Sequence, residues 1–209
     1  MALFWWNSKT STFFMMVVVS ICARQIAGKE SCRIPKINED INWKEMSRTW
    51  YLGLHTNDVV MSKDIVYCCK SENVTSTSYG GSMMITEYHQ NSPAIVFPAH
   101  FIRQDNGIYT VDKNDDAAII EAESQYPDGK TNENAARFDK ARLDSPTIPL
   151  SDGKNYLIYA WCVFDKWIVW TQFSTSTPTQ HQINEFQRAL DKYGINADMY
   201  PCQQVDANK

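Results

Sequence analysis

The sequence predicts an all-β fold, either a barrel or a sandwich, followed by one helix near the C-terminus. Short runs rich in β-branched and aromatic residues are separated by turn signals such as SYGG, QNSP and YPDGK, a pattern typical of strands. No helical pattern interrupts the series, which favours a barrel or a sandwich. The predicted strands cover residues 50–56, 73–79, 82–89, 94–102, 107–112, 116–124, 155–164 and 166–173.

The N-terminal segment predicts a secretory leader. The apolar run FFMMVVVSI (13–21) follows Lys9 and has the length of a signal-peptide core. It is shorter than the roughly 20 apolar residues that span a bilayer, and no later segment is apolar enough to cross a membrane. We therefore expect a signal peptide over residues 1–23, with cleavage between residues 22 and 28, and a single secreted domain over residues 24–209.

Charge and sequons indicate the environment of the mature protein. The formal net charge of −4 argues against nucleic acid as a partner, because binding to phosphates needs a basic face. The tripeptide NVT at Asn73 predicts a glycosylation site, which suits an extracellular protein.

Cysteine usage predicts two disulfides and one remaining thiol. Of the six cysteines, Cys22 falls within the leader, and five remain for an oxidising compartment. Their spacing contains no C-x-x-C pair, so we expect no zinc site. The five are Cys32, Cys68, Cys69, Cys162 and Cys202.

One acidic stretch, DKNDDAAIIEAE (112–123), nearly matches a calcium-binding EF-hand loop. Its sixth position is Ala117, where the tight turn of that loop demands glycine, and its flanks are predicted as strands. We therefore predict a polar turn and no metal site. The four histidines are scattered along the chain, which argues against a haem cofactor.

The strands at 155–164 and 166–173 predict a hairpin. They flank Asp165-Lys166, a turn signal between two long apolar runs. Both runs are apolar on both faces. One face of each strand should therefore line an interior, and the other should pack against a further element.

A helix after this hairpin is predicted to be that element. Thr179 and Gln182 form a capping-box pattern, and Gly194 stands where a glycine commonly ends a helix. The apolar residues between them recur at intervals of three and four, which predicts one apolar stripe. The stripe consists of Ile183, Phe186, Leu190 and Tyr193.

Three stretches resemble motifs of the lipocalin family, namely MSRTWYLGL (46–54), LSDGKNYLIYAWC (150–162) and QFSTSTP (172–178) with the helix that follows. The resemblance covers nearly the whole mature chain. It implies an eight-stranded, up-and-down antiparallel barrel with one C-terminal α-helix packed outside. It also implies that Trp50 lies at the closed floor of the barrel. We expect no enzymatic activity, because no local motif places a nucleophile beside a base.

Three positions depart from the family motifs. Arg48 replaces the glycine of the first motif, and Gly153 replaces a tyrosine of the second. Ser176 stands where the third motif has an arginine, so the usual closure of the floor by an arginine over Trp50 is expected to be missing.

The cysteine layout resembles that of apolipoprotein D and the insect bilin-binding proteins. This resemblance implies a Cys32–Cys162 disulfide, and a second one between Cys202 and either Cys68 or Cys69.

Strand alternation bears on that choice. If Cys68 points outward, then Lys70 and Glu72 do so too, while Cys69, Ser71 and Asn73 face inward. The opposite register would bury both charges, at a cost of several kcal/mol. We therefore predict a Cys68–Cys202 disulfide, a buried thiol at Cys69, and an Asn73 that often lacks a glycan.

The resemblance also implies which residues face the barrel interior. Tyr159 and Trp161 precede the strand-ending cysteine by three residues and one residue, and Leu157 is in phase with them. On the next strand, Trp170 and Gln172 are expected to face inward. We expect these five residues to bind a small hydrophobic ligand of the bilin, retinoid, fatty-acid or sterol type, with no other cofactor.

Alternatives to this interpretation remain. The interior aromatic residues would serve only as a packed core if the barrel holds no ligand. An amine scavenger would need a carboxylate in the cavity, for which Glu87 and Glu121 are the candidates. A protein partner bound through the loops, as in an anti-haemostatic inhibitor, and a thiol enzyme that uses Cys69 are further alternatives.

Overall fold

The structure, a computed structural model, describes residues 31–61, 68–88, 93–105, 107–124 and 131–202. The predicted leader and its cleavage site lie outside these ranges. None of the helices within them combines the length and the apolar character that a membrane span needs.

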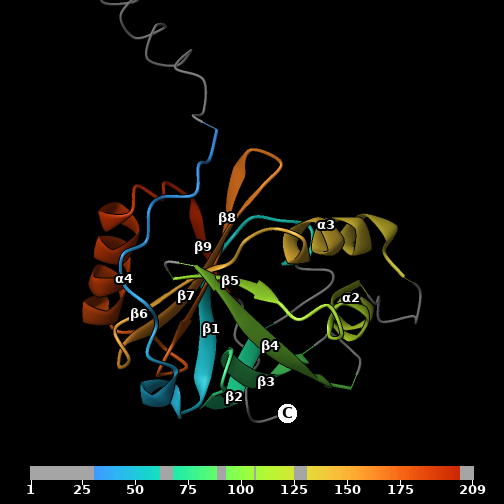
Figure 1. Ribbon diagram of the computed structural model, residues 1–209, viewed down its shortest axis with the longest axis horizontal. Coiled ribbons are helices and arrows are strands. Elements are labelled where there is room, and N and C mark those ends of the chain that lie inside the picture. The colour runs from blue at the N-terminus through green and yellow to red at the C-terminus, as the bar shows by residue number, and fades with distance from the viewer. Residues whose placement is uncertain (1–30, 62–67, 89–92, 106, 125–130, 203–209) are drawn as a thin grey trace, which may run out of the picture. The chain divides into compact units, whose positions relative to one another are not determined.

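Strands form a single antiparallel sheet in this part of the chain (Figure 1). They are β1 (Trp50–Thr56), β2 (Cys68–Ser76), β3 (Gly80–Tyr88), β4 (Ile95–Asp105), β5 (Ile108–Val111), β6 (Ile148–Ser151), β7 (Tyr156–Val163), β8 (Lys166–Phe173) and β9 (Met199–Pro201). Eight of them follow the order β5-β4-β3-β2-β1-β8-β7-β6, and β9 pairs with β1 off this path. The predicted eight-stranded antiparallel architecture is confirmed.

The two ends of this sheet meet at one isolated bridge between Tyr109, in β5, and Thr147, next to β6. The Tyr109 N–H donates to the Thr147 carbonyl oxygen at 2.8 Å, and the Thr147 N–H donates to the Tyr109 carbonyl oxygen at 2.7 Å. These two hydrogen bonds bring the sheet round into a nearly closed barrel.

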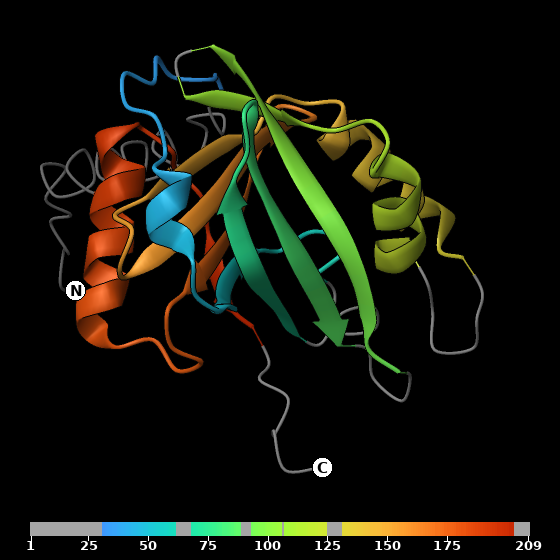
Figure 2. The same ribbon diagram turned by 60° about the horizontal axis from the view of Figure 1, so that its bottom comes forward.

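Helices lie on two sides of the barrel (Figures 1 and 2). They are the 3-10 turn η1 (Trp43–Met46) and the α-helices α2 (Asp116–Ser124), α3 (Glu133–Leu143) and α4 (Gln180–Lys192). In both views α4 lies on one side of the barrel, and α2 and α3 lie together on the other.

The C-terminal helix α4 packs on the outer face of the barrel, as predicted. Thr179 and Gln182 form the expected capping box, and Gly194 follows the helix with φ +65°. Phe186 and Leu190 belong to one buried cluster with residues from the outer faces of β6, β7 and β8. These contacts account for the second apolar face of the hairpin strands.

The prediction of a strand over residues 116–124 is wrong, because this segment forms α2. Its alanines and Glu121 favour a helix over a strand. The helix α3, which the sequence interpretation missed, begins at Asn132, whose side chain accepts hydrogen bonds from the N–H groups of Asn134 and Ala135. The eighth strand of the barrel is β6 instead.

The hairpin turn between β7 and β8 is Phe164-Asp165, one residue earlier than predicted. Val163 pairs with Lys166, and both turn residues have positive φ, of 49° and 59°. Such a pair of values is typical of the two-residue turns that match the twist of a hairpin.

The floor of the barrel is closed by η1 and the start of β1. Trp50 is fully buried, and its Nε1–H donates to the carbonyl oxygen of Met46 at 3.0 Å. The guanidinium of Arg48 lies 5.6 Å from the centre of the Trp50 ring. The expectation that no arginine covers this tryptophan is therefore wrong, because Arg48 takes the place of the absent arginine at Ser176.

Candidate ligand site in the barrel

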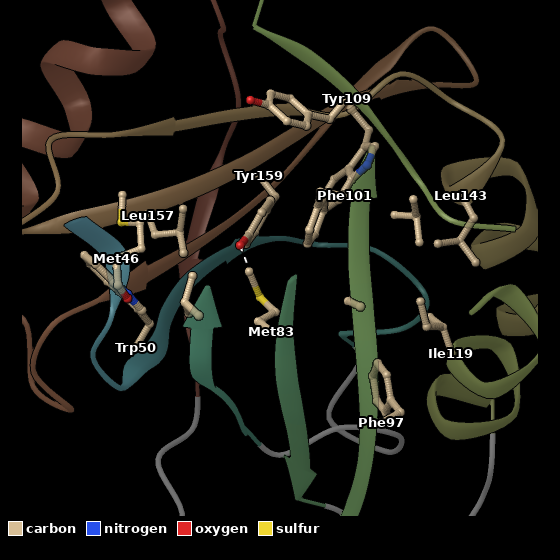
Figure 3. Close-up of a cluster of buried hydrophobic side chains, with 14 of the residues drawn as sticks. Met46, Trp50, Met83, Phe97, Phe101, Tyr109, Ile119, Leu143, Leu157 and Tyr159 are labelled. Carbon is tan, nitrogen blue, oxygen red and sulfur yellow. Dashed lines mark hydrogen bonds between the residues drawn. The ribbon is translucent and has the colours of Figure 1, made fainter. Parts of the chain in front are cut away.

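A row of aromatic rings runs through the barrel interior. Phe101 of β4 stacks on Tyr159 of β7 with ring centres 5.2 Å apart, and Tyr159 stacks on Trp161 at 6.0 Å. Trp161 then meets Trp170 of β8 edge to face at 5.2 Å. The Tyr159 hydroxyl points toward the sulfur of Met83 at 3.3 Å (Figure 3). Burial holds the pKa of Tyr159 well above its usual value, so the ring stays neutral.

The five predicted interior residues all face inward. Leu157, Tyr159 and Trp161 of β7 belong to the buried interior cluster, and Trp170 packs against that cluster. Gln172 is buried, and its side-chain amide donates to the Ser71 hydroxyl at 2.7 Å. Four of the five line one cavity, whereas Leu157 does not. Their role in ligand binding stays a prediction.

This cavity has a volume of about 40 Å³. Sites for drug-sized ligands usually measure about 300–1,000 Å³, whereas a volume of this size holds only water. The interior side chains are therefore closely packed in this structure.

Two helices cover the end of the barrel opposite η1. Ile119 of α2, with Arg142 and Leu143 of α3, lines the cavity. Figure 3 shows Ile119 and Leu143 at one end of the interior cluster, and Met46 and Trp50 at the other. No sequence pattern had indicated these three cavity residues, because neither helix was predicted.

The cover carries a buried ion pair. Arg142 and Asp139 are 4% and 0% exposed, and an Nη2 to Oδ1 distance of 2.8 Å joins them. The guanidinium of Arg142 also lies over the rings of Trp161 and Trp170, at 5.0 and 4.4 Å from their centres. Arg142 thus covers one face of each of these two rings.

One candidate carboxylate faces the interior and the other does not. Glu87 of β3 is 2% exposed and lines the cavity. Glu121 lies on α2 and is exposed, because the segment is a helix instead of the expected strand. The interior is therefore mainly apolar and aromatic, with the ionisable side chains of Glu87 and Arg142.

The segment after β1 is held against the covered end by Asp58. Its carboxylate accepts hydrogen bonds from the Trp170 indole N–H at 2.9 Å and from the backbone N–H groups of Val60 and Met61 at 3.0 and 2.9 Å. Burial raises the pKa of this carboxyl group, which the hydrogen bond from Trp170 partly offsets. Asp58 thereby fixes the orientation of one predicted ligand-binding ring.

The predicted Cys32–Cys162 disulfide is present, with Cα atoms 5.6 Å apart. In β2, Cys69 and Ser71 are buried in the interior, as the preferred register requires. The Cys68 side chain lies outside the described residues, so its pairing with Cys202 stays a prediction. Cys69 and Cys202 both belong to one buried cluster.

Asn73 does not face inward, contrary to the prediction. The pairing of β2 with β3 shifts register between Glu72 and Thr75, and Asn73 lies in this bulge with φ +53°. Asn73 is exposed, whereas Val74 is buried. Lys70 and Glu72 form an ion pair at 2.9 Å on the outer face. The bulge lets both the charged pair and the sequon reach solvent, and glycosylation of Asn73 stays a prediction.

A nearly closed, eight-stranded antiparallel barrel with η1 under its floor and α4 on its wall is a lipocalin fold. Insecticyanin from the tobacco hornworm Manduca sexta has a similar structure, with a TM-score of 0.56 and 9% identity over 84% of this chain and 87% of that chain. Lobster apocrustacyanin A1 matches with a TM-score of 0.52 and 12% identity, over 83% of this chain and 92% of its own. Apocrustacyanin C1 matches with a TM-score of 0.53 and 10% identity, over 83% of this chain and 92% of that chain. At these identities the similarity establishes the fold.

Comparisons of the sequence with family models and with curated proteins found no match.

Proposed function

We propose that this protein binds a small, flat, hydrophobic molecule inside its barrel and acts outside the cell as a carrier or scavenger. The observation that supports this function most directly is the row of stacked rings Phe101, Tyr159, Trp161 and Trp170 inside an apolar barrel. Interiors of eight-stranded barrels are wide enough for one small ligand. Aromatic faces favour a conjugated or sterol-like molecule, since rings stack on one another.

Binding requires room that the closed structure does not contain. A cavity of about 40 Å³ cannot admit such a ligand, so α2 and α3 must move away from the barrel. Their departure would uncover the faces of Trp161 and Trp170 on which Arg142 now lies. The ligand would then replace Arg142 on these rings.

A secreted location is supported by two independent features. The predicted leader precedes the domain, and the Cys32–Cys162 disulfide is of the kind that persists in oxidising compartments.

Fluorescence titration of the mature protein tests the proposal. Retinol, fatty-acid, sterol and bilin probes should include one that quenches tryptophan emission saturably, at one ligand per protein and micromolar or tighter affinity. Trp170→Phe should reduce the quenching, because Trp170 lines the cavity. Trp167→Phe is the matched control, since Trp167 lies on the outer face of the same strand. Absence of any saturable signal across these probes would contradict a carrier function.

A second candidate ligand, an aromatic amine, is favoured by Glu87. A carboxylate beside aromatic rings is what an organic cation needs, because the charge and the ring faces both attract it. Serotonin and histamine should then bind the mature protein. Glu87→Gln should remove amine binding while it preserves the binding of a neutral probe. Equal loss of both would assign Glu87 a structural role.

A further inference from the structure

Outside the barrel, α2, α3 and the β7–β8 turn form an open groove of about 880 Å³. Phe164, at the tip of the β7–β8 hairpin, lines the groove together with residues of both helices. The apolar part of the lining comes from Ile120, Ala136, Ala141 and Phe164. The groove is far larger than the interior cavity, and the two share no lining residue.

Phe164 is an unusual residue for its position at the rim of this groove. Its side chain is 65% exposed and its φ is +49°. Glycine, asparagine and aspartate are the residues that normally adopt this conformation in hairpin turns, and a bulky residue with positive φ is a genuine outlier. Strain of this kind is concentrated at functional sites.

The charged part of the lining is cationic, although the chain carries a net charge of −4. It consists of Arg137, Lys140 and Asp144. Asp144 already pairs with Lys140 and with Lys113 from outside the groove. Arg137 donates only a long hydrogen bond, of 3.4 Å, to the neutral side chain of Asn134, and no described carboxylate pairs with it. The groove therefore combines an apolar wall with an available guanidinium.

We propose that this groove binds an aliphatic carboxylate of the fatty-acid type. The chain would lie along Ile120, Ala141 and Phe164, and the carboxylate would accept two hydrogen bonds from Arg137. A guanidinium matches a carboxylate with two parallel hydrogen bonds, which a lysine ammonium does not. This site shares no lining residue with the interior cavity, but α2 and α3 contribute to both, so the helix movement proposed for ligand entry would also change this groove.

Calorimetric titration of the mature protein with dodecanoate, below its micelle concentration, tests the proposal. Dodecanoate should bind at one site, and dodecanol should bind at least tenfold more weakly because it lacks the charge. Arg137→Gln should weaken dodecanoate binding at least tenfold. Arg188→Gln, on the exposed face of α4, is the matched control and should leave the affinity unchanged.

Phe164→Asn separates a binding role from a structural one. Asparagine tolerates the positive φ, so this variant should have a higher melting temperature and yet bind dodecanoate at least fivefold more weakly. Dodecanoate that binds Arg137→Gln and Phe164→Asn as tightly as the natural protein would place its site elsewhere and overturn the proposal. Absence of any dodecanoate binding would overturn it as well.

Discussion

Arg48 shows how two departures from the lipocalin motifs offset each other. The motif glycine is replaced by Arg48, and the motif arginine by Ser176. In the structure, Arg48 covers the ring of Trp50, and its Nη1 donates to the carbonyl oxygen of Lys154 at 3.3 Å. The cation over the floor tryptophan is thus retained, although a different part of the chain supplies it.

Arg48→Ala should lower the free energy of unfolding by about 0.5–1 kcal/mol, because an exposed cation–π contact contributes about that much. Urea denaturation of the mature protein measures the change. Lys44→Ala, which removes an exposed charge from the neighbouring turn η1, is the control and should have little effect. Equal losses in the two variants would show that the contact between Arg48 and Trp50 does not stabilise the floor.

Residue-level prediction succeeded where alternation is regular and failed where it is interrupted. On β7 and β8, the inward positions that the family resemblance implied for Tyr159, Trp161 and Trp170 agree with the structure, because both strands are free of bulges between these positions. On β2 strand alternation placed Asn73 inside, whereas a bulge after Glu72 turns it outward. Nothing in the sequence of β2 predicts the extra residue of this bulge.

At the level of elements, α4 was predictable and α3 was not. The capping box and apolar stripe of α4 are strong local signals, and apart from the capping-box residue Gln182 its buried residues are apolar. The buried face of α3 includes the ion pair of Asp139 and Arg142. Two charges on that face hide the apolar periodicity that would have revealed the helix. The covered end of the candidate site, which depends on α2 and α3, was therefore missed.

Pro149 explains why β6 was also overlooked. Proline cannot donate to a strand ladder, so within sheets it is found at edges. The structure pairs β6 with β7 on one side, and on the other side the isolated bridge to Tyr109 involves Thr147, just before the strand. Apart from that bridge, β6 behaves as an edge strand, so Pro149 is tolerated there.

Leu190→Ala in α4 should cost about 2–5 kcal/mol, because it removes a fully buried side chain and leaves a cavity against the barrel wall. Leu190 is 1% exposed and packs with Phe186 and the outer face of β6, β7 and β8. Thermal unfolding of the mature protein measures the loss. Gln187→Ala, on the exposed face of the same helix, should change the melting temperature little. An unchanged melting temperature in Leu190→Ala would show that the helix is not docked.

At the scale of the whole domain, both ends of the described chain are attached to the barrel. At the N-terminal end the Cys32–Cys162 disulfide closes a loop across a sequence separation of 130 residues. At the C-terminal end β9 pairs with β1, and the N–H of Cys202 donates to the carbonyl oxygen of Gly53 at 2.9 Å. The loop closed by the disulfide restricts the unfolded chain, which stabilises the fold by roughly 4–5 kcal/mol in the chain-entropy model.

Peptide mapping of the unreduced mature protein should recover Cys32 linked to Cys162 and Cys68 linked to Cys202. The second link is expected because Cys69 faces the interior, and neighbouring residues of a strand point to opposite faces. Digestion after reduction is the control, since both linked peptides should then disappear. A Cys69–Cys202 peptide would reverse the assignment of the second disulfide.

The bridge between Tyr109 and Thr147 has a consequence for motions of the native state. Between β5 and the start of β6, two backbone hydrogen bonds join Tyr109 to Thr147, whereas the pairs β2–β3, β3–β4 and β7–β8 share long ladders. Native proteins open locally where few backbone hydrogen bonds hold a segment, and this local opening costs less free energy than full unfolding. Because α2 and α3 connect β5 to β6, this seam and the two helices should form one cooperative unit. Its amide protons should exchange with solvent long before those of β7 and β8.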